Sequence, residues 1–196
     1  MKCGTPRNRA DLILAMRSCN QTTGMTVHRH GMMVSDYYQD LISHLRTGTP
    51  LTYEWRLPDW IHDPALLEDL PSDSVMQDYH VFHDCGKPFC RTVDEAGIQH
   101  FPDHATVSKK AWLASGGSEE VGELIGMDMD VHLLKGDEVE AFARRPQARA
   151  LLLTALSEVH ANASMFGGIG STSFKIKWKH VDKRGRAILK IIPAMA

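Results

Sequence analysis

The chain has 196 residues, of which 43% are hydrophobic and 23% are charged, and this is sufficient for one globular domain with a core. The net charge of −2, from 22 basic and 24 acidic residues, gives no overall signal of a nucleic-acid-binding protein, although a local basic patch is compatible with one. No apolar run approaches the roughly 18 residues of a membrane span, and the N-terminus lacks an apolar signal stretch, so we expect a cytoplasmic protein without a membrane partner.

Apolar side chains at helical spacing predict a mainly α fold. The first expected helices end at a break over 21–24 and at a Gly-Thr-Pro stop over 48–50. Gly86 and Pro88 end a later helix, and a loop over 89–103 contains a turn signal at 94–97. The expected helices cover residues 9–19, 29–45, 65–70, 75–83, 105–115, 119–134, 137–144 and 147–165.

The C-terminal segment has a different pattern from the rest of the chain. Residues 174–179 alternate apolar and basic side chains, residues 182–185 resemble a turn, and residues 187–192 are again apolar. Strict alternation is typical of a strand, so we expect a basic β-hairpin over 171–196, appended to a helical domain over 1–170.

The most informative motif is His83-Asp84, followed by Cys85-Gly86-Lys87-Pro88. Adjacent side chains on a helix point in very different directions, so both can reach one ion only where the helix ends. A histidine nitrogen beside a carboxylate oxygen is a donor set suited to a divalent ion that activates water.

Further metal-ligating side chains lie on both sides of this pair. Together they follow the order His, His-Asp, His, Asp, which resembles the HD-domain phosphohydrolase superfamily over roughly residues 30–132. The resemblance implies an HD-domain-like helical bundle that holds one or two divalent ions (Mn, Co, Ni, Fe, Mg or Zn). The metal ligands that it implies are His30, His83, Asp84, His100, His104 and Asp128.

Some of these assignments have competitors in the sequence. His28 is an alternative to His30, which leads directly into the helix expected over 29–45. Asp130 is an alternative to Asp128, but an inward Asp128 shares its helix face with Val121 and other apolar residues, which favours it. His100 is either the extra ligand of a two-metal site or an exposed loop histidine.

The resemblance also implies an activity and a substrate class. It implies a phosphoester hydrolase acting on a nucleotide or a nucleic acid, with a phosphomonoesterase favoured and a cyclic-phosphate phosphodiesterase close behind. Asp84 and Lys87 would be catalytic: metal coordination lowers the pKa of a bound water, the resulting hydroxide attacks phosphorus, and Lys87 neutralises the phosphate oxygens.

The C-terminal lysines offer a second contact to substrate. On a strand, Lys175, Lys177 and Lys179 would share one face and could bind a phosphate backbone of RNA or DNA, with Trp178 nearby for stacking. The alternative is an edge hairpin that its lysines keep soluble.

Two other classes of protein compete with the enzyme. One is a catalytically silent HD-like module that binds nucleotide or nucleic acid. The other is a structural zinc protein that uses Cys85 and Cys90, but no second cysteine pair completes such a site, so we expect thiols at Cys3, Cys19, Cys85 and Cys90. Methionine-rich helical surfaces are compatible with a homodimer.

Overall fold

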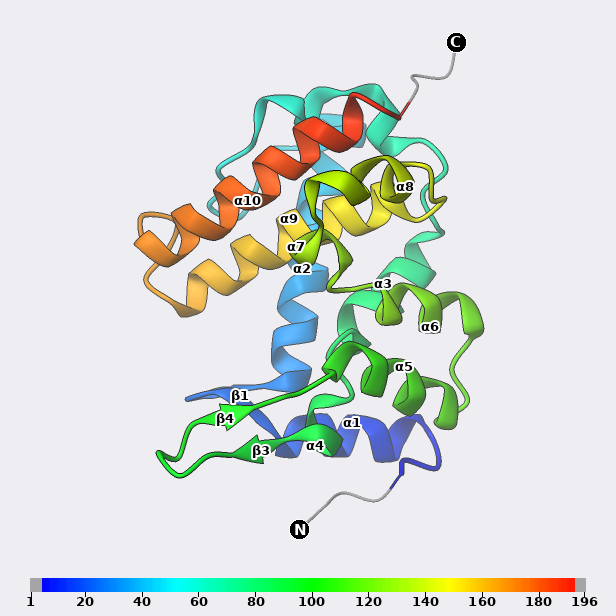
Figure 1. Cartoon of the computed structure of the whole chain (residues 1–196), viewed down its shortest axis with the longest axis vertical. Helices are drawn as coiled ribbons and strands as arrows, with labels where there is room; N and C mark the ends of the chain where they lie inside the picture. The colour runs from blue at the N-terminus through cyan, green and yellow to red at the C-terminus, as the bar shows by residue number, and fades with distance from the viewer. Residues whose placement is uncertain (1–4, 193–196) are drawn as a thin grey trace. The chain divides into compact units, whose positions relative to one another are not determined.

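The computed structural model describes residues 5–192, and the contacts of this chain form two compact units (Figure 1). Residues 5–33 and Asp73–Asp128 form unit 1, and Val34–Ser72 and residues 129–192 form unit 2. The protein is mainly helical, as the sequence predicted. No helix within residues 5–192 has both the length and the apolar content that crossing a membrane requires.

Unit 1 is built from short helices and two small antiparallel ribbons. Helix α5 packs on α6, α6 packs on α3, and α4 lies against α1 and α5. Its elements are α1 (Arg9–Ser18), β1 (Asn20–Thr22), β2 (Met25–Thr26), the start of α2 (Val27–Thr47), α3 (Asp73–Phe82), α4 (Lys87–Cys90), β3 (Thr92–Val93), β4 (Gln99–His100), α5 (His104–Ala114) and α6 (Glu119–Gly126).

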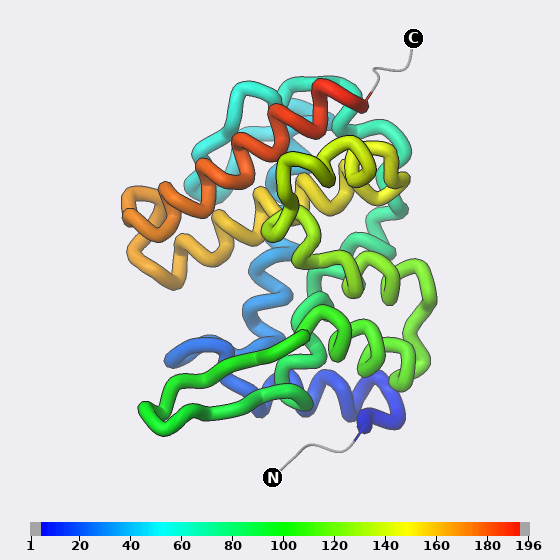
Figure 2. Tube along the Cα trace, in the orientation of Figure 1, coloured from blue at the N-terminus to red at the C-terminus, as the bar shows by residue number. Residues whose placement is uncertain are grey.

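Unit 2 is organised around α9, whose leucines and alanines are buried on almost every side. Helices α7, α8 and α10 pack against it, and α10 runs alongside α9 in the tube trace (Figure 2). Its elements are the rest of α2, η1 (Asp59–His62), η2 (Pro64–Leu67), α7 (Asp130–Leu133), η3 (Gly136–Glu138), α8 (Val139–Ala143), α9 (Ala148–Met165) and α10 (Thr172–Leu189).

The predicted C-terminal β-hairpin is wrong, because Thr172–Leu189 form the single helix α10; residues 193–196 of the predicted segment lie outside the described residues. The Ser171 side chain caps its start by accepting a hydrogen bond from the Phe174 amide at 3.2 Å. The buried residues of the helix are Phe174, Val181, Gly185 and Ile188, a spacing of 7, 4 and 3 that follows a helical stripe. The alternation seen in the sequence covered only six residues, and Ile176 within it is 55% exposed, so it did not mark the buried face.

The expected face of three lysines is therefore also wrong. On a helix each residue turns the chain by roughly 100°, so Lys175 and Lys179 share one face while Lys177 lies on another. The helix remains rich in basic side chains, but they do not form the single row that a strand would present.

Two smaller differences from the predicted elements lie in the segments that connect the helices. The helix expected over 119–134 is interrupted after Gly126, and Asp128 lies in the turn between α6 and α7. The loop expected over 89–103 begins with α4 and then forms the ribbon β3–β4, whose tip is the predicted turn: the Gly97 amide donates to the Asp94 carbonyl oxygen at 3.0 Å.

Candidate metal centre

The His83-Asp84 pair lies where α3 ends. Helix α3 stops at Phe82, and tight turns follow, with the Cys85 amide donating to the Phe82 carbonyl oxygen and the Lys87 amide donating to that of Asp84. Leaving the helical path allows the two side chains to meet, and His83 Nε2 is 3.2 Å from Asp84 Oδ2. Both side chains are buried, as expected for a pair held inside the unit.

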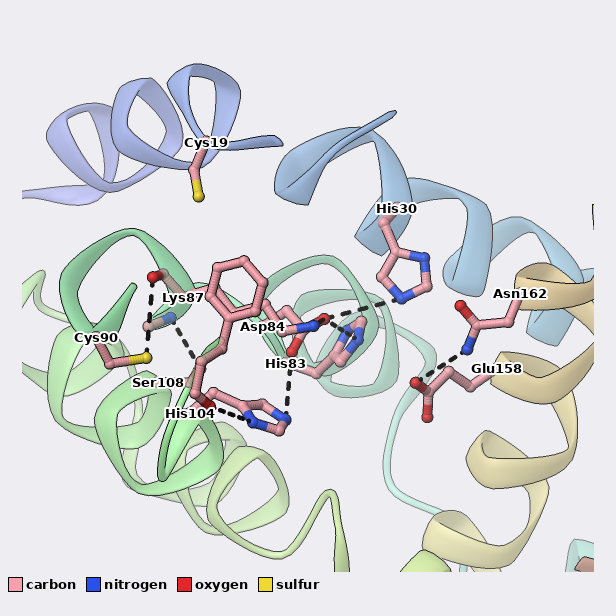
Figure 3. Close-up of polar contacts among 12 residues, drawn as sticks. Cys19, His30, His83, Asp84, Lys87, Cys90, His104, Ser108, Glu158 and Asn162 are labelled. Carbon is pink, nitrogen blue, oxygen red and sulfur yellow. Dashed lines mark hydrogen bonds and ion pairs between the residues drawn. The ribbon is translucent and has the colours of Figure 1, made fainter. Parts of the chain in front are cut away.

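His30 reaches the pair from the first turns of α2. Its Nε2 is 3.8 Å from Asp84 Oδ2, and its ring lies edge-on to the ring of His83, with centroids 5.2 Å apart (Figure 3). The close approach depends on Gly31, because a Cβ at this position would overlap the carbonyl oxygen of Val81 in α3. His30 is fully buried, whereas its sequence competitor His28 is not.

His104 approaches Asp84 from the opposite side. It is the first residue of α5, it follows Asp103, whose φ of 51° is left-handed, and its Nε2 is 3.7 Å from Asp84 Oδ1. The side chain is 22% exposed, so this edge of the group faces solvent. Asp84 therefore has histidine nitrogens near both of its carboxylate oxygens.

Backbone carbonyl groups fix the proton positions on two of these rings. His83 Nδ1 lies 2.7 Å from the His80 carbonyl oxygen, and His104 Nδ1 lies 3.2 Å from that of Phe101. A carbonyl oxygen only accepts, so Nδ1 must carry the proton, and in a neutral ring Nε2 then presents a lone pair. Both Nε2 lone pairs point toward the Asp84 carboxylate. A positive charge between these nitrogens and the carboxylate would stabilise this arrangement.

The geometry fits a metal ion. The donor atoms of His30, His83 and Asp84 all lie within 4.8 Å of one another. Histidine nitrogens and carboxylate oxygens bind Zn²⁺ at about 2.0–2.2 Å, so two donors on one ion are roughly 3–4 Å apart. The three residues, with His104 beside them, could hold a metal ion.

Lys87 adds a cation to the same group. Its Nζ lies 2.6 Å from Asp84 Oδ2 and 5.4 Å from the centre of the Phe101 ring, and the side chain is 12% exposed. Burial alone would raise the pKa of Asp84, but the charge of Lys87, followed by that of His83, holds this pKa well below its usual range. Asp84 is therefore a carboxylate at neutral pH.

The other two predicted ligands, Asp128 and His100, also belong to unit 1. Asp128 is buried and accepts a hydrogen bond from the Tyr79 hydroxyl at 2.8 Å. Its competitor Asp130, the first residue of α7, forms a half-exposed ion pair with Arg145 at 2.6 Å. His100 is on the exposed ribbon, where its Nε2 lies 2.7 Å from Asp94 Oδ2 and not in the group around Asp84.

Sequence reasoning missed the part played by Tyr79. The available signal was that a buried tyrosine hydroxyl normally requires a polar partner. In the structure that partner is Asp128, so the hydroxyl fixes one of its carboxylate oxygens.

Gly86 explains why the motif contains glycine. Its amide donates to Ser108 Oγ at 2.8 Å, and a Cβ at this position would lie 2.6 Å from the Val107 carbonyl carbon and 2.7 Å from Ser108 Cα. The turn that carries Asp84 thus rests directly on the backbone of α5. Gly86 therefore allows the close approach of this turn to α5, in addition to ending the preceding helix.

Replacing Gly86 with alanine should lower the free energy of unfolding by about 2 kcal/mol, since backbone atoms of α5 cannot move aside without disturbing the helix. Denaturant unfolding measures the effect. Gly136→Ala is the control, because nothing lies within 4 Å of a Cβ there. An equal change in both variants would show that the contact with α5 contributes nothing.

The state of the cysteine thiols tests the alternative of a structural zinc protein that uses Cys85 and Cys90. Cys19, Cys85 and Cys90 form no disulfide among the described residues, and Cys3 lies outside them. The Cys85 thiol donates to the Ser108 carbonyl oxygen at 3.3 Å, and burial raises the pKa of this thiol. A thiolate ligand at this position is therefore disfavoured.

Comparison of the chain with protein-family models, with curated proteins and with solved structures found no match. The chemistry of the group around Asp84 is therefore inferred from the residues of the group alone.

Proposed function

We propose that this protein is an HD-domain-like phosphohydrolase that uses one or two divalent ions and acts on a phosphoester of a nucleotide or a nucleic acid. The observation that carries the proposal is the convergence of His30, His83 and His104 on the carboxylate of Asp84, with Lys87 beside it. A phosphomonoesterase is favoured, with a cyclic-phosphate phosphodiesterase as the second choice.

The residues of the group have separable roles. Asp84 is the only one of the converging ligands whose side chain can bind two ions at once, because each of its oxygens has its own histidine neighbour. A bound divalent ion would lower the pKa of a water molecule and so supply a nucleophile at neutral pH. Lys87, held on Asp84, is placed to neutralise an anionic phosphate oxygen at the partly exposed edge of the group.

The test combines metal content with phosphate release. Purified full-length protein is given nucleotides, 2′,3′-cyclic nucleotides and 5′-phosphorylated oligonucleotides, each with Mn²⁺, Co²⁺, Ni²⁺ or Mg²⁺. We expect metal-dependent release of phosphate, or ring opening of the cyclic substrates. His83→Ala should reduce turnover at least about a hundredfold, and His62→Ala, at an exposed histidine, should not.

Three results would contradict the proposal or replace it. Turnover that survives in His83→Ala would assign the activity to another site. Absence of bound metal under every condition would rule out the metal centre. Bound metal without turnover on any substrate would favour the alternative, a silent module that binds nucleotide or nucleic acid.

A further inference from the structure

Unit 2 contains a pocket of its own. It has a volume of about 390 Å³ and is lined by residues of α7, α9 and α10 together with Met129, which precedes α7. This volume is within the range of small-molecule sites, roughly 300–1,000 Å³. Its lining divides into a basic, an apolar and a hydrogen-bonding part.

The basic part comes from one face of α10. Lys177, His180 and Arg184 are spaced by three and four residues, so they follow one another over roughly 10 Å of helix. Arg184 Nε donates to the Leu134 carbonyl oxygen at 3.1 Å, which orients the guanidinium group. Among residues 5–192, neither Lys177 nor Arg184 forms an ion pair, so both charges are available to an anion.

The apolar part is formed by Met129, Leu133 and Val159. Leu133 is 66% exposed, which leaves apolar surface for a flat ligand group to cover. A ligand that satisfies both parts has an anionic end and an apolar, planar body.

The hydrogen-bonding part comes mainly from α9. Asn162 Nδ2 donates to Glu158 Oε1 at 3.3 Å (Figure 3), and Glu158 Oε2 lies 2.9 Å from His132 Nε2. Both oxygens of this carboxylate are thus engaged with neighbouring side chains. Asn162 keeps an amide oxygen and a second N–H, which suit the polar edge of a nucleobase.

We propose that this pocket binds a nucleoside monophosphate, with the phosphate on Lys177, His180 and Arg184 and the base against Leu133 and Val159. The pocket shares no residue with the group around Asp84, and the proposal does not depend on hydrolysis. Phosphate is favoured over a carboxylate because several basic groups in a row match a dianion with three acceptor oxygens.

Calorimetric titration of full-length protein with AMP, adenosine and inorganic phosphate, in buffer with a chelator, tests the proposal. We expect AMP to bind more tightly than adenosine or phosphate, because only AMP contacts both the basic and the apolar part of the pocket. Lys177→Gln should weaken AMP binding about tenfold and leave adenosine unchanged. Leu133→Ser, at an exposed position, should weaken AMP and adenosine alike.

Two controls distinguish this pocket from the rest of α10 and from the group around Asp84. Lys179→Gln, two residues along the same helix and outside the pocket lining, should bind AMP as the wild type does. The chelator removes any divalent ion from the group around Asp84, so failure of the proposed hydrolase leaves this result intact. Circular dichroism confirms that each variant is folded.

A 5′-phosphorylated oligonucleotide distinguishes a free nucleotide from the end of a polynucleotide. Weaker binding of the oligonucleotide than of AMP assigns the free nucleotide, and tighter oligonucleotide binding that still weakens in Lys177→Gln assigns the terminal nucleotide. No binding of AMP at millimolar concentration would overturn the proposal. An equal loss in Lys177→Gln and Lys179→Gln would also overturn it, because the effect would then come from the overall charge of α10.

Discussion

Asp84→Asn should abolish metal binding and reduce turnover at least about a thousandfold, the largest effect that we expect from a single substitution. The change keeps the shape of the side chain and removes its charge. Asp84 lies close to every other member of the group: His30 at 3.8 Å, His83 at 3.2 Å, His104 at 3.7 Å and Lys87 at 2.6 Å. An amide cannot hold a divalent ion among neutral imidazoles as a carboxylate does.

A binding readout makes this prediction independent of the substrate. A ligand that binds only the folded state stabilises it, by about 2.7 kcal/mol at a hundred times its dissociation constant. Mn²⁺ or Co²⁺ should therefore raise the melting temperature of the wild type and leave that of Asp84→Asn unchanged. Asp94→Asn, at an exposed carboxylate paired with His100, is the matched control. An equal shift in all three proteins would place the ion elsewhere.

The second large effect concerns stability and pH in unit 2. His160 is buried and held by two hydrogen bonds: its Nδ1 donates to the Leu156 carbonyl oxygen at 2.7 Å, and its Nε2 accepts from the Arg56 amide at 3.1 Å. The ring also packs against the tilted ring of Trp55, with centroids 4.4 Å apart. The bond from the Arg56 amide requires the neutral ring, since a protonated Nε2 would face another donor.

Burial lowers the pKa of His160 to about 4, below the value of about 6.5 in an unfolded chain. The unfolded state therefore binds more protons between these two values. The stability that the neutral ring contributes is complete above pH 6.5 and is lost as the pH falls toward 4. Between pH 7 and pH 5 the loss from this residue should be about 2 kcal/mol.

Denaturant unfolding of the wild type and His160→Gln at pH 7 and pH 5 measures this difference. The variant should be less stable at pH 7, because the ring contact with Trp55 is lost. Between pH 7 and pH 5 its free energy of unfolding should fall by about 2 kcal/mol less than that of the wild type. Burial, and then the charge of His83, lowers the pKa of His80 to about 3. His80 therefore also lowers the free energy of unfolding on acidification, by the same amount in both proteins. Parallel pH curves for the two proteins would show that His160 is not the group responsible.

Most of the helices could be predicted because their apolar stripes extend over several turns. The stripe that leads from Val34 to Leu41 predicted α2, and the leucines of α9 predicted a buried helix. The prediction failed at α10, where a short alternation of apolar and basic residues was given more weight than the longer stripe from Phe174 to Ile188. Alternation over six residues arises easily on a helix surface, so the longer pattern was the better guide.

The group around Asp84 was only partly predictable. The position of His83-Asp84 at a helix end, and the participation of His30 and His104, were expected from the order of the motifs. For His100 the sequence left two positions open, an extra metal ligand or an exposed loop histidine, because the pattern does not show which way its side chain points. The structure pairs it with Asp94 on the exposed ribbon. The role of Gly86 against α5 is a contact between distant segments, which no local pattern records.

Two of the imidazoles around Asp84 are oriented by main-chain oxygens at positions 80 and 101. Every residue type provides such an oxygen, so replacing the side chain at either position leaves the acceptor in place. The proton positions on the two rings therefore do not depend on which side chain stands at position 80 or 101. Sequence variation at these two positions is therefore compatible with an unchanged set of donor atoms around Asp84.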